Sequence, residues 1–96
     1  MKTQKKYNKY INLMYNKHMG TIVVFRNVRI IVRTNDHAPP HIHAIRGDAE
    51  AKIEIESLEV CASKGFSKRD LQRIIEFMTT QEELLMEAWY AIHEKE

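Results

Sequence analysis

Residues 49–56 alternate strictly between apolar and charged side chains, and this alternation constrains the fold more than any other feature of the chain. The apolar positions are Ala49, Ala51, Ile53 and Ile55, and the charged positions are Glu50, Lys52, Glu54 and Glu56. Successive side chains of a strand point to opposite faces of a sheet, so a period of two places all the apolar residues on one face. The segment predicts a strand with one buried face and one solvent-facing face, as in an antiparallel sheet.

Three more strands are predicted before this one. Residues 21–26 are rich in β-branched and aromatic side chains, Asn27 offers a tight turn, and residues 28–34 alternate between an apolar face and a partly basic face. The paired Pro39 and Pro40 interrupt ladder hydrogen bonding, so residues 35–40 are predicted to form a loop. Residues 41–46 return to an extended form, and residues 46–48 form a turn. Residues 58–61 are interpreted as a short extension of the last strand.

Helices are predicted at both ends of the chain. Residues 3–18 fit an amphipathic helix, and the C-terminal third holds a helix that begins at a capping box of Ser67 and Asp70. A second capping box, Thr80 with Glu83, begins a second helix or a kinked continuation of the first. The predicted fold is α+β: a small antiparallel sheet of about four strands, C-terminal helices packed on one face, and an extra N-terminal helix.

The length of 96 residues is that of one domain. We divide it into a basic N-terminal helix or extension (1–19) and an α+β histidine-motif domain (20–96). No apolar stretch approaches the roughly 20 residues of a spanning helix, and the N-terminus lacks the apolar segment of a signal peptide. Cys61 is the single cysteine and is predicted to be a small buried strand residue. These features predict a cytoplasmic protein without membrane contact, and they leave a homo-oligomer open.

Charge is distributed unevenly along the chain. Residues 1–46 carry nine Lys and Arg residues and one acid, whereas residues 47–96 carry six Lys and Arg residues and twelve acids. Such a split indicates two surfaces with different partners. Equally, the basic part can pack near the acidic part, within one chain or across a dimer.

The segment from Asp36 to Ala44 is the strongest functional signal. His41 and His43 are separated by one residue, a spacing that puts both rings on the same face of a strand, and the two prolines stiffen the loop that precedes them. Asp36, His37, His41 and His43 are therefore candidate catalytic residues. Three readings stay open: a structural role, a catalytic or nucleic-acid site, and a weaker metal site at His37, His41 and His43. No Cys pair or His-Glu-x-x-His motif is present, so no metal ligand is assigned.

Basic residues interleaved with tyrosines occur in the first half of the chain. Such mixtures can hold phosphates and stack bases, although a solvated face explains them equally well. The candidate nucleic-acid-binding residues are Arg29, Arg33, Arg46, Lys5, Lys6 and Lys9.

The run Asp36-His37-Ala38-Pro39-Pro40-His41-Ile42-His43-Ala44 resembles the signature of a small bacterial domain-of-unknown-function family with a Pro-Pro-His-x-His segment. The resemblance continues over residues 47–52, 63–71 and 83–89, and it covers about residues 20–93. Members of this family usually begin close to the first strand, whereas in this chain a basic segment, residues 1–19, precedes it. The resemblance implies the toxin component of a type II toxin–antitoxin system, since such a domain is typically encoded beside an antitoxin-like protein.

The function expected from these features is that of a toxin neutralised by a small cognate antitoxin and acting on nucleic acid. A nuclease-like activity would use the histidines as acid and base, with Arg29, Arg33 or Arg46 on phosphate. The alternative is a non-catalytic module that binds DNA or docks onto a partner protein. No cofactor is assigned.

Overall fold

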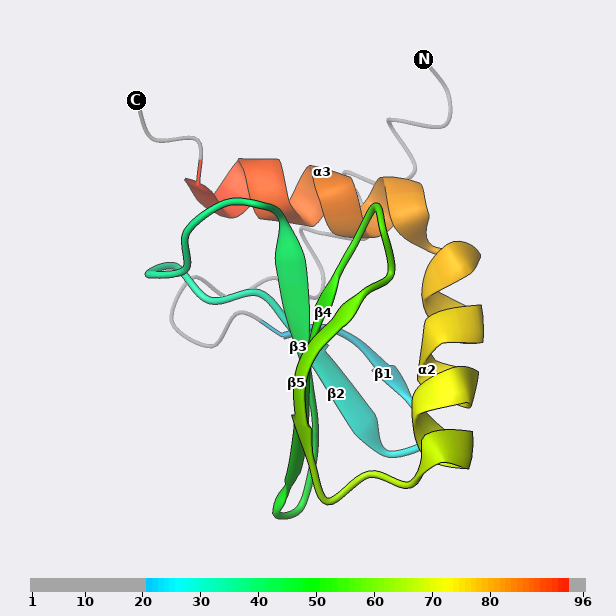
Figure 1. Cartoon of the computed structure of the whole chain (residues 1–96). Coiled ribbons are helices and arrows are strands. Elements are labelled where there is room, and N and C mark those ends of the chain that lie inside the picture. The colour runs from blue at the N-terminus through cyan, green and yellow to red at the C-terminus, as the bar shows by residue number, and fades with distance from the viewer. Residues whose placement is uncertain (1–20, 94–96) are drawn as a thin grey trace.

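The computed structural model describes residues 21–93 (Figure 1). The strands are β1 (Thr21–Phe25), β2 (Val28–Ile31), β3 (His41–Arg46), β4 (Ala49–Glu54) and β5 (Val60–Lys64). Two helices follow them, α2 (Lys68–Thr79) and α3 (Glu82–His93). The α+β class and the two C-terminal helices are confirmed. The helix predicted over residues 3–18 lies outside the described residues.

The five strands form one antiparallel sheet in which the spatial order follows the chain, β1-β2-β3-β4-β5. The prediction of about four strands is one too few, and the missing strand is β5. Its side chains are mostly exposed and show no apolar alternation, so hydrophobic patterning carries no signal for it. Backbone pairing with β4, as between Ala51 and Ser63, defines this edge strand instead.

The first hairpin is closed by a two-residue turn. Phe25 pairs with Val28, and the two residues between them, Arg26 and Asn27, have φ angles of 49° and 67°. Two successive left-handed residues give the type I′ geometry that matches the twist of paired strands. The tight turn predicted at Asn27 is confirmed.

A glycine and a capping serine bring α2 against the sheet. Gly65 has a φ angle of +87°, and a Cβ atom added there would lie 2.9 Å from the Cα atom of Ala49 on β4. A side chain at this position would strain the backbone and clash, so the approach requires glycine. Two residues later, the Ser67 hydroxyl accepts a hydrogen bond of 3.0 Å from the backbone N–H of Asp70, which confirms the predicted start of the helix.

One face of the sheet carries most of the hydrophobic core. The pairs Ile42–Ile53 and Ala44–Ala51 stand side by side on β3 and β4 and are almost completely buried. The buried residues of α2 and α3 join the same core cluster; they are Ile74, Met78, Leu84, Leu85, Ala88, Trp89 and Ile92. Complete burial of an Ile or Leu side chain stabilises a fold by roughly 1.5–3 kcal/mol, so these contacts fix both helices on the sheet.

The junction between the helices differs from its prediction. The Thr80 hydroxyl donates a hydrogen bond of 2.7 Å to the carbonyl of Phe77, and the Thr80 backbone also bonds back into the last turn of α2. Thr80 therefore ends α2 and does not form a capping box with Glu83. Two separate helices result, and α3 runs across the end of the sheet where β3 begins (Figure 1).

Cys61 is exposed, contrary to its prediction as a buried residue. It lies on the edge strand β5, where most side chains face solvent. Among the described helices, none is long and apolar enough to cross a membrane.

Candidate active site at the start of strand β3

His41 and His43 are the first and third residues of β3, and their side chains lie on the same face of the sheet, as predicted. Ile42 and Ala44 point to the opposite face and are 0% exposed. The two histidines are buried as well, with exposed fractions of 3% and 7%. Buried polar side chains need partners, so the atoms around these two rings define what the site can do.

Both rings converge on the carboxylate of Asp36, in the loop between β2 and β3. Its Oδ2 atom lies 3.0 Å from Nε2 of His41 and 2.9 Å from Nε2 of His43. The end of this loop is fastened to the sheet, because the backbone N–H of Ile55 donates a 3.1 Å hydrogen bond to the carbonyl of Pro40. We call these three side chains the Asp36–His41–His43 cluster.

The tautomer of His41 follows from its second ring nitrogen. Nδ1 lies 2.9 Å from the carbonyl oxygen of Pro39, which can only accept, so Nδ1 carries a proton and donates it. In the neutral ring, Nε2 then holds a lone pair. Although Oδ2 of Asp36 is close to Nε2, it lies off the direction of a hydrogen bond, and Nε2 of His41 is a buried atom without a hydrogen-bond partner among the described residues.

His43 has partners that allow two tautomers. Its Nδ1 atom lies 3.5 Å from Nη1 of Arg33, which can only donate, and 3.3 Å from Oε2 of Glu50, which can only accept. Arg33 and Glu50 also form an ion pair at 3.3 Å. Either Nδ1 accepts from Arg33 while Nε2 donates to Asp36, or Nδ1 donates to Glu50. His43 is therefore the member of the cluster best placed to exchange protons.

Helix α3 supplies the wall behind the cluster. The ring of Trp89 lies 5.2 Å from that of His41, centroid to centroid, and stacks on the ring of His93 at 3.7 Å. Trp89 is 4% exposed and belongs to the hydrophobic core. Its contact with His41 joins distant parts of the chain, and no local sequence pattern reports such a contact.

A hollow of about 290 Å³ opens beside His43. We call it the histidine hollow; its lining residues are His43, Glu50, Ala51, Lys52, Ala62, Ser63 and Lys64. Two lysines and one acid line it, so its charged groups favour an anion, although most of its surface is apolar. The sequence predicts Glu50 and Lys52 only as outward-facing residues. Ser63 and Lys64 enter the sequence analysis only within the segment that carries the family resemblance, because the hollow depends on the unpredicted strand β5.

The arrangement supports two kinds of chemistry. A carboxylate between two imidazoles is a combination that can accept and return protons during bond cleavage. Two imidazole nitrogens and one carboxylate oxygen are also a donor set that transition metals prefer, and the three ligand atoms lie within 4.8 Å of one another.

The structure separates the remaining predicted residues. His37 is exposed and lies outside the cluster, although it belongs to the same loop. Arg33 lies beside His43, and Arg29 pairs with Ile45 two residues further along β3, on the same face as the histidines. Lys5, Lys6 and Lys9 lie outside the described residues.

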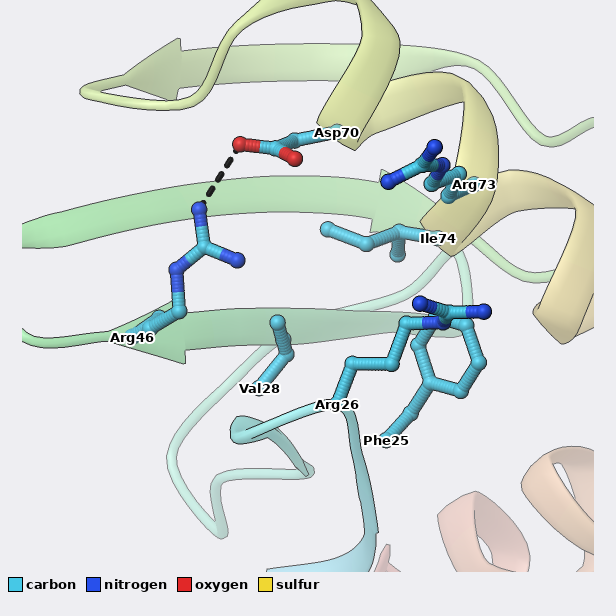
Figure 2. A pocket seen from close by; sticks show the side chains of 7 residues that line it. All are labelled: Phe25, Arg26, Val28, Arg46, Asp70, Arg73 and Ile74. Atoms are coloured by element: carbon cyan, nitrogen blue, oxygen red, sulfur yellow. Dashed lines mark hydrogen bonds and ion pairs between the residues drawn. The ribbon is translucent and has the colours of Figure 1, made fainter.

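Arg46 lies in a second hollow, at the other end of β3 and on the other face (Figure 2). This arginine hollow has a volume of about 130 Å³, and its lining residues are Phe25, Arg26, Val28, Arg46, Asp70, Arg73 and Ile74. The guanidinium of Arg26 lies over the Phe25 ring at 5.5 Å from its centroid. Three guanidiniums and one carboxylate line a surface that attracts anions.

Asp70 and Arg46 form the shortest ion pair of the described residues, with 2.7 Å between Nη2 of Arg46 and Oδ2 of Asp70. This hydrogen bond, helped by the capping interaction with Ser67, holds the pKa of Asp70 below its ordinary value. Both side chains reach solvent, so the pair contributes little to stability.

A comparison with models of protein families finds one that matches residues 27–90, described as a domain of unknown function, DUF4160. The matched part runs from the turn after β1 to α3 and includes the Asp36–His41–His43 cluster and most of both hollows. Searches of curated proteins and of solved structures each found no match. Since the family model covers well over half of the chain, the protein belongs to the DUF4160 family.

Proposed function

We propose that the protein is a toxin that cleaves phosphodiester bonds in nucleic acid by acid–base catalysis at the Asp36–His41–His43 cluster, and that a small cognate antitoxin neutralises it. The observation that carries the catalytic part is the convergence of two buried imidazoles on one carboxylate oxygen, at 2.9 and 3.0 Å. The toxin part rests on the family resemblance described above.

The roles follow from the surroundings of each ring. Cleavage needs one group that takes the proton of the attacking oxygen and another that gives a proton to the leaving oxygen. His43 borders the histidine hollow and has two reachable tautomers, so it is the base or acid that meets the substrate. His41 is the second proton-transfer group, and Asp36 orients both rings.

Cationic side chains around the hollow are suited to the phosphate. Lys52 and Lys64 line it, and Arg33 lies beside His43. Positive groups placed where negative charge develops in the transition state are commonly the largest contribution to catalysis. The antitoxin would act by covering this hollow, because its opening is the route to His43.

Growth of a bacterium that expresses the full chain tests the proposal. We expect growth arrest, relief by co-expression of the gene encoded next to it, and relief by the double variant His41→Ala/His43→Ala. His37→Ala is the matched control, since this histidine belongs to the same loop but is exposed and outside the cluster. Normal growth at strong expression of the wild type contradicts the toxin role, and full arrest by a folded double variant contradicts the catalytic one.

A second candidate is a non-catalytic module that binds nucleic acid, and the arginine hollow favours it. Arg26, Arg46 and Arg73 gather around a hollow that is much larger than a water molecule (Figure 2). In this case the cluster has a structural role and ties the loop over residues 32–40 to the sheet. Binding of a labelled DNA or RNA that weakens steeply with added salt, without cleavage, would favour this candidate.

A further inference from the structure

We infer that the Asp36–His41–His43 cluster binds a divalent transition-metal ion, with Zn²⁺ the best fit, through Nε2 of His41, Nε2 of His43 and a carboxylate oxygen of Asp36. This inference rests on the proposed function and changes its chemistry: with the ion held by Nε2 of both rings, His41 and His43 are ligands, and the water that the ion activates takes over the proton transfer assigned to them above. Neither sequence motif nor composition indicated it, and the weaker idea based on the sequence placed His37 where the structure has Asp36.

The first argument is the orphaned nitrogen of His41. Its Nε2 atom belongs to a side chain that is only 4% exposed and has no hydrogen-bond partner among the described residues, although a carboxylate oxygen lies 3.0 Å away. A buried polar atom without a partner costs about 1–3 kcal/mol. Because Nδ1 donates to Pro39, Nε2 of the neutral ring carries a lone pair that no donor among the described residues meets, and a metal ion would be its partner.

The second argument is the direction of these atoms. The lone pairs of two atoms that bind one metal ion both point at the ion. Each ligand atom therefore lies off the lone-pair direction of the other. The contact between His41 and Asp36 has this character, because it is short yet not aligned for a hydrogen bond. Nε2 of His43 instead forms a 2.9 Å hydrogen bond with Asp36, which a bound ion would replace. Ligand atoms about 2.0–2.1 Å from one Zn²⁺ lie roughly 3.3 Å apart in a tetrahedral site. Here the oxygen lies 2.9 and 3.0 Å from the two nitrogens and all three atoms lie within 4.8 Å of one another, so small side-chain movements would bring them onto one ion.

The third argument is the outer layer of hydrogen bonds. Metal-binding histidines donate their other ring N–H to a carbonyl or carboxylate, which fixes the tautomer that leaves the ligand nitrogen free. His41 has the carbonyl of Pro39 at 2.9 Å from Nδ1, and His43 has the carboxylate of Glu50 at 3.3 Å from Nδ1. His41 therefore has the partner that metal binding requires. His43 has the Glu50 carboxylate within reach of its Nδ1, which is hydrogen-bonded to Arg33 in this structure.

The donor set selects the metal. Two imidazoles favour zinc and its neighbours in the first transition row over Mg²⁺ and Ca²⁺, which prefer oxygen ligands. Three protein ligands leave at least one position for water or substrate, as in catalytic rather than structural zinc sites. A bound Zn²⁺ would supply an activated water beside the hollow lined by Lys52 and Lys64.

Calorimetric titration of the metal-stripped, untagged full chain with Zn²⁺ tests the inference. We expect one Zn²⁺ per chain, and an affinity at least about ten-fold lower in Asp36→Asn and in His43→Gln. His37→Gln is the matched control and should bind as the wild type does. Absence of binding by the wild type at micromolar Zn²⁺, or wild-type affinity in both ligand variants, overturns the inference.

A second measurement covers the case in which the variants do not fold. Nitrogen NMR spectra of the wild-type imidazoles, recorded with and without Zn²⁺, should show a large shift of Nε2 in His41 and His43 and little change in His37. Unmoved Nε2 signals contradict the site. Growth arrest without zinc binding overturns the metal inference alone, whereas zinc binding without growth arrest overturns the toxin proposal alone.

Discussion

Strand β3 begins at His41 and ends at Arg46, roughly 17 Å away, and the polar groups at these two ends are held in different ways. At the first end, two buried histidines and Asp36 crowd together beneath Trp89. At the other end, Arg46 and Asp70 pair at the surface beside Arg26 and Arg73. Burying polar groups away from water lowers the stability of the fold unless they are well paired, whereas an exposed ion pair changes the stability very little.

This difference bears on function. Burying an unpartnered ring nitrogen adds nothing to stability, and Nε2 of His41 and of His93 are two such atoms among the described residues. The proposed chemistry gives a role to that of His41. The arginine end can be explained by surface charge alone. The predictions below test this contrast, beginning with the largest expected effect.

Trp89→Ala should have the largest effect on stability. Removing a side chain that is 4% exposed and packed on His41 should lower the free energy of unfolding by about 3–5 kcal/mol, as measured by urea denaturation. Its neighbour Tyr90 is 56% exposed, so Tyr90→Ala should change stability by no more than about 0.5 kcal/mol. Equal losses in the two variants would mean that α3 does not support the histidine end.

Asp36→Ala should have an intermediate effect. The change leaves Nε2 of His43 buried without its acceptor, which costs about 1–3 kcal/mol, toward the lower figure because Asp36 is partly exposed. Urea denaturation in zinc-free buffer measures the loss, and Asp48→Ala, in the exposed turn after β3, is the control. An unchanged free energy of unfolding would show that Asp36 does not hold the loop to the sheet.

Arg73→Gln should alter nucleic-acid binding only if the arginine hollow holds phosphate. Fluorescence anisotropy at several salt concentrations gives the slope of the logarithm of the binding constant against the logarithm of salt concentration. Loss of one phosphate contact should reduce the magnitude of this slope by about one. Arg69→Gln, an exposed position of α2 that does not line the hollow, is the matched control. The same salt dependence in both variants would remove the arginine hollow as a phosphate site.

Asp70→Asn should have the smallest effect, and one that depends on pH. The pKa of Asp70 is lowered by its hydrogen bond to Arg46, so its ionised form is favoured by folding. The stabilisation is complete above the ordinary value of 3.8 and is lost as the pH falls through the lowered pKa of the folded protein. Wild type and variant should therefore differ in melting temperature at neutral pH and converge in acid; a difference that persists in acid contradicts this explanation.

The sequence predicts the fold well where local patterns carry it. The local sequence alone predicts three features: the strand β4 from its alternating residues, the turn at Asn27 and the helix cap at Ser67. Hydrophobic patterning misses the edge strand β5 because its side chains do not alternate. The prediction that Cys61 is buried rests on the usual burial of cysteine, and the edge position of β5 overrides it. Thr80 was read as a cap because its hydroxyl can serve either the helix before it or the one after it.

The candidate site could be predicted only in part. A period of two places His41 and His43 on one face, and the structure confirms this. The choice of Asp36 over His37 as their companion depends on the path of a loop, which sequence spacing does not define. Trp89 and the histidine hollow required the arrangement of α3 and β5, which long-range packing decides.

Growth of cells that express His43→Gln or Arg46→Gln, compared at matched protein levels, tests most directly that function resides at the histidine end of β3. Each variant removes one polar side chain from one end of the same strand. We predict that His43→Gln restores growth and that Arg46→Gln arrests growth as the wild type does. Arrest by His43→Gln together with normal growth under Arg46→Gln would contradict the account and assign the function to the arginine end.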